Sequence, residues 1–309
     1  MVTPMRVSVS NTVIQWAIKN GEKSETELMK KYDLHAWENP TSTRDYPTFK
    51  QIQNFSHDTR IPVNYFFKQT LPQEEHTFAK FRTINNTNIQ PSRRLIETIQ
   101  VMESYQAWMK DFLLNQDKAI KFQLLASVKA TMNVDKVAQQ IIEILHLENL
   151  AATKLTDDDF FNLLRSKLSN AGVMVMQSGI VGTNPHRPLD INEFRAFVLV
   201  DNVIPLIFIN STDSKKAKIF SLIHEFVHIL LGDNEILNVS PETEIHQERW
   251  INQITSAVLM PLKEIKAALS TSLNHQANLV HLSQLFHTSL VATAIRLKLL
   301  GQKPSKKTN

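Results

Sequence analysis

The sequence contains no cysteine among its 309 residues, and it contains only six glycines. Without cysteine, the chain cannot form a disulfide scaffold, a thiolate zinc site, an iron–sulfur cluster or a thiol nucleophile. Any zinc must therefore bind histidine and carboxylate side chains. The few glycines form neither a Walker A pattern nor a dinucleotide fingerprint, so we expect no nucleotide partner.

Long apolar runs are also missing. The longest, such as residues 203–209, are far too short to cross a bilayer, so we expect no membrane partner. The N-terminus lacks a basic start followed by a continuous apolar stretch, which argues against a signal peptide. We therefore expect a soluble, cytoplasmic protein.

The balance of charge selects no partner. The 34 basic and 30 acidic residues leave a net charge of +4, which is low for a nucleic-acid-binding protein. The apolar fraction of 42% is sufficient for a core, and the length allows two domains or one large domain.

The first 70 residues are predicted to form short helices joined by polar turns. Residues 11–19 place apolar side chains on one helical face, and Ser24 with Glu27 forms a capping box that opens a helix through Lys31. Another helix is predicted for residues 48–56, before Ile61-Pro62.

The rest of the chain is predicted to be helical with a small sheet. Helical periodicity continues from residue 92 to about 147, and Phe112, Phe122, Phe160 and Phe161 are predicted core residues. Strands follow, with a hairpin turn at Asp201-Asn202. The predicted strands are 172–177, 194–200 and 204–209, and the remaining helices are 157–168, 215–231, 247–259, 262–268 and two segments within 278–300.

The sharpest local signal is His224-Glu225-x-x-His228 within the predicted helix 215–231. Histidines four residues apart lie on the same face of a helix, so both imidazoles can reach one metal ion. Glu225 lies about 100° around the helix from His224, where it can approach a water near the metal without being a ligand. Two fixed nitrogens and a nearby base are typical of a hydrolytic zinc site.

A catalytic zinc site requires a third protein ligand. The downstream acidic candidates are Asp233, Glu235, Glu242, Glu244 and Glu248. The first two follow the helix-ending Gly232 too closely to fold back easily. Glu248 shares a helical face with Asn252 and Thr255, so a helix packed against the histidine helix could present Glu248 to the metal. The alternative is a solvated glutamate at a helix start.

These motifs resemble the ImmA/IrrE family of zinc metallopeptidases. The family typically shows His-Glu-Leu-Gly-His, then Glu-x-x-Ala-Asn and Leu-Leu-Met-Pro, and here the last two segments read Glu248-x-x-x-Asn252 and Ala257-Val-Leu-Met260-Pro261 with the same spacing. The resemblance covers roughly residues 170–301. It implies zinc ligation by His224, His228 and Glu248, with Glu225 as general base and acid. We further expect Asn252 to support Glu248 or its helix.

The N-terminal region resembles an Xre-type helix-turn-helix. The resemblance rests on Trp37-Glu38-Asn39, on Pro47-Thr48 opening a helix, and on Pro62-x-x-x-Phe66, although Asn39-Pro40 stands where a glycine is expected. Asp33, Leu34 and His35 are poor readers of base edges, so DNA remains open as a partner.

Together these patterns predict a mostly helical α+β fold. We expect a zincin-like metallopeptidase domain with a small antiparallel sheet at residues 91–309, made of a helical lead-in, 91–170, and a catalytic core, 171–301. A helix-turn-helix module, 1–72, and a linker, 73–90, precede it.

The resemblance implies a zinc endopeptidase whose protein substrate is a regulator, most simply a repressor, with a role in transcription regulation or in the control of a mobile element. Two other functions stay open. One is a DNA-binding regulator, and the other is an antitoxin-type protein that binds a partner without cutting it. In either, the zinc site would be structural or vestigial.

Overall fold

The computed structural model describes residues 4–68, 70, 80–82, 91–118, 120–148, 154–232, 241–270 and 272–301, without the side chains of 80–82 and 241–244. The chain divides into two compact units. The N-terminal unit comprises Met1–Thr77 and Ile89–Ile99, and the second unit comprises Phe78–Asn88 and Gln100–Asn309.

The N-terminal unit is built from short, well-capped helices. The predicted capping box at Ser24 and Glu27 is confirmed, and Thr48 with Gln51 forms a second one. Each box satisfies backbone N–H groups that a helix start would leave without partners. The elements are α1 (Asn11–Asn20), α2 (Glu25–Met29), α3 (Leu34–Glu38), α4 (Phe49–Thr59) and the 3₁₀ helix η1 (Val63–Phe67).

An aromatic cluster forms the centre of this unit. The ring of Phe55 lies between those of Trp37 and Phe66, with edge-on contacts at centroid distances of 5.6 and 5.5 Å. The first turns of α5 (Arg93–Asn115) join the unit through an ion pair between Arg94 and Glu22. The residues on which the Xre-like resemblance rests thus include core residues of this unit.

The second unit contains a four-stranded sheet in the order β1-β3-β4-β2. The predicted hairpin is confirmed, because β3 (Ala196–Leu199) and β4 (Leu206–Asn210) are antiparallel. β1 (Lys80–Arg82) pairs antiparallel with β3. The prediction of an antiparallel sheet is wrong for β2 (Met174–Ser178), which runs parallel to β4. The hairpin occupies one edge of β4, and the long connection after β2 lets β2 line the other edge in parallel.

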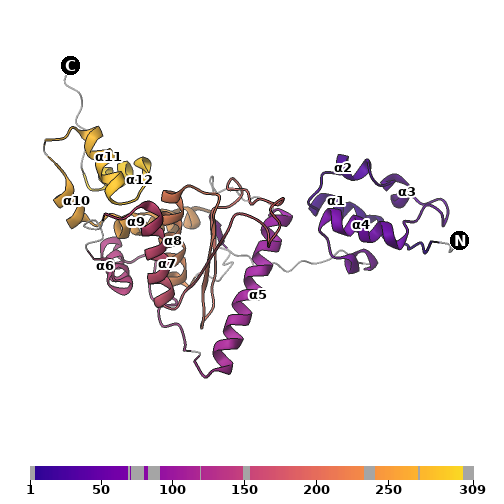
Figure 1. The fold of residues 1–309 in the computed structure, drawn as a ribbon, viewed down its shortest axis with the longest axis horizontal. Coiled ribbons are helices and arrows are strands. Elements are labelled where there is room, and N and C mark those ends of the chain that lie inside the picture. The colour runs from indigo at the N-terminus through magenta and orange to yellow at the C-terminus, as the bar shows by residue number, and fades with distance from the viewer. Residues whose placement is uncertain are drawn as a thin grey trace, which may run out of the picture. The chain divides into compact units, whose positions relative to one another are not determined.

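Helices lie on opposite sides of these strands. Figure 1 shows α5 on one side, with α7 (Asp157–Asn170) and α8 (Lys215–Leu231) on the other. The remaining helices are α6 (Val134–Leu145), α9 (Pro241–Leu259), α10 (Leu262–Ala268), α11 (His275–Leu285) and α12 (Leu290–Leu299). Within the described residues, no helix combines the length and apolar character needed to span a membrane. The mostly helical chain with a small sheet agrees with the predicted α+β class.

The continuous helical stretch predicted from residue 92 to 147 is wrong. Helix α5 ends at Asn115 and α6 begins only at Val134. Between them Asp117 and Ala126 adopt left-handed backbone angles, with φ of +51° and +55°, which no α-helix can contain. The intervening segment is bonded to other elements of the unit instead of to itself alone.

The predicted aromatic core is confirmed in part. Phe122, Phe160 and Phe161 are buried, but Phe112 is 47% exposed. Phe112 stacks on Trp108, which is also exposed, at a centroid distance of 5.9 Å. The opposite face of α5 contacts the β3–β4 hairpin, where Gln106 donates hydrogen bonds to the carbonyls of Leu199 and Ile204. The helical period was correct, but the sheet covers a different face of α5.

The predicted division into a module at 1–72, a linker at 73–90 and a peptidase domain at 91–309 stays a prediction. Residues 71–79 and 83–90 lie outside the described residues. The described part of the predicted linker is β1, which belongs to the sheet of the second unit.

Candidate metal centre

Helix α8 carries both histidines through the interior of the second unit. It begins at the N-cap Ser214, whose hydroxyl accepts from the backbone N–H of Ala217, and ends at Gly232 with a left-handed φ of +70°. The helix packs against α7, α9, β3 and β4, so residues on all of its faces are buried between positions 221 and 230. The predicted helix end at Gly232 is confirmed.

His224 and His228 lie on the same face of α8. Their side chains are almost fully buried, and their Nε2 atoms are 3.3 Å apart. The spacing of four residues places the two rings one turn apart, with centroids separated by 5.0 Å. The local sequence therefore produces the predicted pair of nitrogen donors.

Glu248 reaches this pair from helix α9. Its Oε2 lies 3.4 Å from Nε2 of His224, and its Oε1 lies 3.3 Å from Nε2 of His228. These three residues also form the group of possible metal ligands within the described chain, with one ligand atom from each within 4.8 Å of the others. Helix α9 packs closely on α8, and this packing brings the carboxylate to the imidazoles.

The three distances fit a shared metal ion better than direct hydrogen bonds. An N–H···O hydrogen bond has its optimum near 2.9–3.0 Å, and separations of 3.3–3.4 Å are long for one. Two ligand atoms bound at about 2.0–2.1 Å to one tetrahedral ion lie about 3.4 Å apart. Two imidazole nitrogens and a carboxylate at this spacing could hold a four-coordinate metal ion.

The electrostatics of Glu248 agree with a ligand role. Burial raises the pKa of its carboxyl group, but the neighbouring imidazoles of His224 and His228 outweigh burial and hold the pKa below its ordinary value. The carboxylate is therefore ionised at neutral pH. A negative ligand beside two nitrogen donors favours a divalent cation over an uncharged ligand.

Glu225 is also buried, at 1% exposure. It follows His224 directly on α8 and is not part of the group of three. The four predicted site residues are thus placed on two packed helices, with three of them converging and Glu225 beside one of them.

Glu248 is the one acidic candidate for the third ligand whose side chain the structure describes. Asp233 and Glu235 lie outside the described residues, and so do the side chains of Glu242 and Glu244. Asn252, predicted to support Glu248, lies one turn further along α9 and is partly buried. Within the described part of α9, the structure brings Glu248 to the two histidines.

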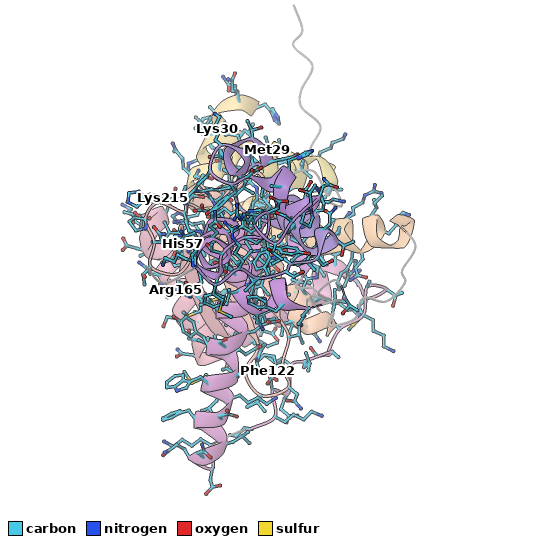
Figure 2. All side chains as sticks on the ribbon, turned by 90° about the vertical axis from the view of Figure 1, so that its right-hand side faces the viewer. Met29, Lys30, His57, Phe122, Arg165 and Lys215 are labelled. Atoms are coloured by element: carbon cyan, nitrogen blue, oxygen red, sulfur yellow. The ribbon has the colours of Figure 1, made fainter. Side chains whose placement is uncertain are left out.

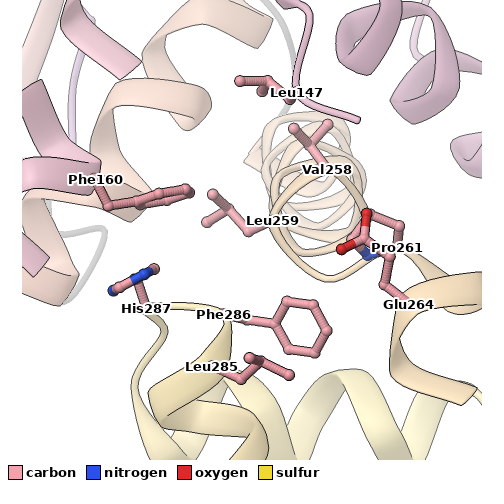
Figure 3. Close-up of a pocket in the computed structure, with 9 residues that line it drawn as sticks. All are labelled: Leu147, Phe160, Val258, Leu259, Pro261, Glu264, Leu285, Phe286 and His287. Atoms are coloured by element: carbon pink, nitrogen blue, oxygen red, sulfur yellow. The ribbon is translucent and has the colours of Figure 1, made fainter. Parts of the chain in front are cut away.

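A small pocket lies elsewhere in the unit, around the end of α9 (Figure 3). His287 lines it and bonds through Nδ1 to Asp157 at 2.7 Å, while its ring stacks on Phe160. The free volume of about 10 Å³ has room for about one water molecule. The pocket contains none of the candidate ligands, and its lining is mostly apolar.

Sequence reasoning missed a long-range hydrogen bond made by α9, the helix that carries Glu248. Trp250 donates a hydrogen bond from Nε1 to the carbonyl of Met132, in the segment predicted to be helical. No local pattern marks this bond, because the two residues are 118 positions apart.

The comparison with protein families agrees with this geometry. Residues 173–298 match the family model Peptidase_M78, described as the IrrE N-terminal-like domain. The matched region includes β2, β3, β4, α8 and α9, and so all four predicted site residues. No curated protein matches the chain. The match does not extend to the N-terminal unit, and the Xre-like module therefore stays a prediction. The match supports the ImmA/IrrE family for residues 173–298, a metallopeptidase type of function and a protein as substrate.

Proposed function

We propose that this protein is a zinc-dependent endopeptidase that cleaves a specific regulatory protein, such as a transcriptional repressor. The observation that carries the proposal is the convergence of His224, His228 and Glu248 at separations of 3.3–3.4 Å. The family match to residues 173–298 supports the same class of reaction.

His224, His228 and Glu248 would hold the metal. Two imidazoles and one carboxylate favour zinc over magnesium or calcium, which prefer oxygen ligands. When bound, zinc supplies a water molecule of lowered pKa and polarises the carbonyl group of the scissile peptide bond. With three protein ligands, the bound ion would still be able to take up this water.

Glu225 would move the protons. In the proposed reaction its carboxylate accepts a proton from the attacking water, whose oxygen bonds to the peptide carbonyl carbon. The carbon–nitrogen bond then breaks, and Glu225 delivers the same proton to the leaving amine. Its burial beside His224 keeps the carboxylate away from bulk water, which strengthens its interaction with the reacting groups.

A regulatory substrate is favoured by the architecture of the chain. The N-terminal unit is a separate small helical unit with a resemblance to Xre-type modules, and such a unit could recognise a regulator. Its candidate recognition helix, α3, has only five residues and begins Leu34-His35, so direct reading of DNA is disfavoured. DNA stays open as a second partner, and we propose the cytoplasm as the location of the protein.

The test compares the wild-type chain with the Glu225→Gln variant. Each is incubated with zinc and a lysate of the native host, and new protein N-termini are identified by mass spectrometry. We expect a small set of fragments from the wild-type chain and at least a hundredfold fewer from the variant, because the amide cannot accept the proton.

Metal analysis is the control, since Glu225→Gln should still bind one zinc ion per chain and unfold at the same temperature. Equal fragments from both proteins would overturn the proposed mechanism. A zinc-loaded wild-type chain that produces no fragments would favour the non-cleaving alternatives, a DNA-binding regulator or an antitoxin-type protein.

A further inference from the structure

The non-helical segment between α5 and α6 contacts both helices that carry the candidate metal ligands. On α8, the backbone N–H of Val128 donates a hydrogen bond to the carbonyl of Leu230 at 3.1 Å. Leu230 lies two residues after His228. On α9, Trp250 donates from Nε1 to the carbonyl of Met132 at 2.9 Å. Trp250 lies two residues after Glu248, so the same short segment is bonded near both ligands.

A turn keeps the two attachment points at a fixed separation. The backbone N–H of Met132 donates to the carbonyl of Lys129 at 2.9 Å, and the N–H of Lys129 is directed at the sulfur of Met132. Val128, at 6% exposure, and Trp250, at 9%, are both buried. Residues 128–132 are therefore a short, internally bonded link between the end of α8 and the middle of α9.

The other end of the segment is anchored to the sheet. The N–H of Phe122 donates to the carbonyl of Asn202, in the β3–β4 turn, at 2.8 Å. The ring of Phe122 is buried; Figure 2 labels this residue. A β-carbon at Gly172 would touch that ring at 3.4 Å. The segment thus begins from a fixed point in the strand layer.

The segment also fits closely against the end of α8. A β-carbon added at Gly232 would lie 2.7 Å from Cβ of Ala126, closer than two carbon atoms can approach. Helix α8 and the segment therefore meet without free space at this point. Any shift of the segment would be transmitted to the end of α8, one turn from His228.

We infer that residues 122–132 form a brace that sets the separation of α8 and α9, and that Trp250 is a positioning residue for metal binding by His228 and Glu248. The inference rests on the proposed function for the metal and for its ligands, and not for the cleavage reaction. The brace lies outside the region that matches the family model, residues 173–298. A metal site requires ligand positions accurate to about 0.2 Å, so a small change in helix separation lowers metal affinity.

The test uses Trp250→Phe in the full chain. Phenylalanine keeps the buried aromatic ring but removes the N–H group that donates to the carbonyl of Met132. We expect zinc affinity, measured by competition with a fluorescent chelator, to fall about tenfold, as for other residues that orient metal ligands. We also expect the visible absorption spectrum of the cobalt-loaded variant to shift, because the ligand geometry changes.

A second variant tests the other attachment. Val128→Pro removes the N–H group that donates to Leu230 and should lower zinc affinity in the same direction. The matched control is Trp37→Phe, the same change at a buried tryptophan of the N-terminal unit, which should leave zinc affinity unchanged.

The outcomes separate the brace from ordinary packing and from the proposed function. Zinc affinity within twofold of wild type in both variants, or an equal loss in Trp37→Phe, would overturn the inference. Reduced affinity and a shifted cobalt spectrum in folded Trp250→Phe or Val128→Pro would support it. A wild-type chain that binds zinc but cleaves nothing contradicts only the proposed function, because the readouts of the brace are affinity and spectrum.

Discussion

Each unit of the molecule contains a carboxylate that faces basic side chains, but the two are built differently. In the N-terminal unit, Asp58 is 7% exposed and accepts hydrogen bonds from Lys23, Lys31 and Tyr32 at 3.0, 2.5 and 2.7 Å. In the second unit, Glu248 faces two imidazole nitrogens at 3.3 and 3.4 Å. The contacts of Asp58 are all 3.0 Å or shorter, as for direct hydrogen bonds, whereas those of Glu248 are longer.

The difference separates a structural carboxylate from a candidate ligand. Lysine is charged at neutral pH and lacks an acceptor atom, so Asp58 with its partners is a complete set of bonds. An imidazole can instead be neutral and offer a lone pair, which makes it the commonest metal-binding side chain. Proximity of acid and base therefore does not identify a metal centre, whereas the type of base and the distance do.

The strongest way to break the comparison is to remove one imidazole. His228→Ala leaves two of the three proposed ligands. Because one ligand of the set is removed, we expect zinc affinity to fall at least about a hundredfold. Equilibrium dialysis with metal analysis measures this. The control is His57→Ala, which removes a histidine that is 70% exposed and outside the group (Figure 2). Stoichiometric zinc on the His228→Ala chain would contradict the proposed ligand set.

Lowering the pH should next affect the two carboxylate sites differently. Protons compete with a metal for imidazole nitrogens, so zinc affinity should fall between pH 7 and pH 5. The loss should approach about tenfold per pH unit for each proton bound once the pH is below the ordinary imidazole pKa of about 6.5. Chelator competition across this range measures the loss. A pH-independent affinity would argue against histidine ligands.

The N-terminal unit should remain folded over the same range. Burial raises the pKa of Asp58, but the bonds from Lys31, Tyr32 and Lys23 outweigh it and hold the pKa below its ordinary value. Because the folded pKa is the lower one, this stabilisation is complete above the ordinary carboxyl pKa of about 3.9 and is lost as the pH falls below it. The hydrogen-exchange protection factors of residues 11–67, which correct for the pH dependence of intrinsic exchange, should therefore stay high at pH 5 and fall below about pH 4.

Asp58→Asn changes the carboxylate of the N-terminal unit. The amide is uncharged and leaves the two lysines without their shared anion, so we expect the N-terminal unit to lose about 2 kcal/mol of stability. The loss is measured by urea unfolding that is monitored by hydrogen exchange. The control is Asp111→Asn, at an exposed position of α5. Zinc affinity should not change, since Asp58 belongs to the other unit. If Asp58→Asn lowered zinc affinity as well as the stability of the N-terminal unit, the two carboxylates would not be independent.

The smallest effect is expected from a helix cap. Thr48→Ala removes the hydroxyl that accepts from the backbone N–H of Gln51 at the start of α4, at a cost of about 1 kcal/mol. Thr48→Ser keeps the hydroxyl and should unfold close to the wild-type urea concentration. Identical curves for Thr48→Ala and wild type would mean that packing alone, without the cap, sets the stability of this unit.

Local geometry explains which features were predictable. The pairing of His224 with His228, the end of α8 at Gly232 and the two capping boxes depend on residues close in sequence. Glu248 was selected by its helical face and by the family resemblance, and it depends on one packing contact between α8 and α9.

Features that depend on distant contacts were not predictable. The backbone of residues 116–118 and 120–133 leaves the helical pattern because the segment bonds to a strand turn and to α8, far away in sequence. The exposure of Phe112 depends on which face of α5 meets the sheet. The parallel pairing of β2 and β4 is set by a connection that passes through β3. In each case the sequence pattern indicated the type of element, but it did not indicate the distant element that contacts it.

The contact between Gly232 and Ala126 limits how such a chain can vary. Position 232 requires a left-handed backbone angle, and its missing β-carbon is the space that the alanine methyl group uses. A side chain at position 232 therefore requires a smaller residue or a displaced backbone at position 126. Related chains that carry a side chain at 232 should have a shortened or displaced segment opposite, so that the two positions vary together.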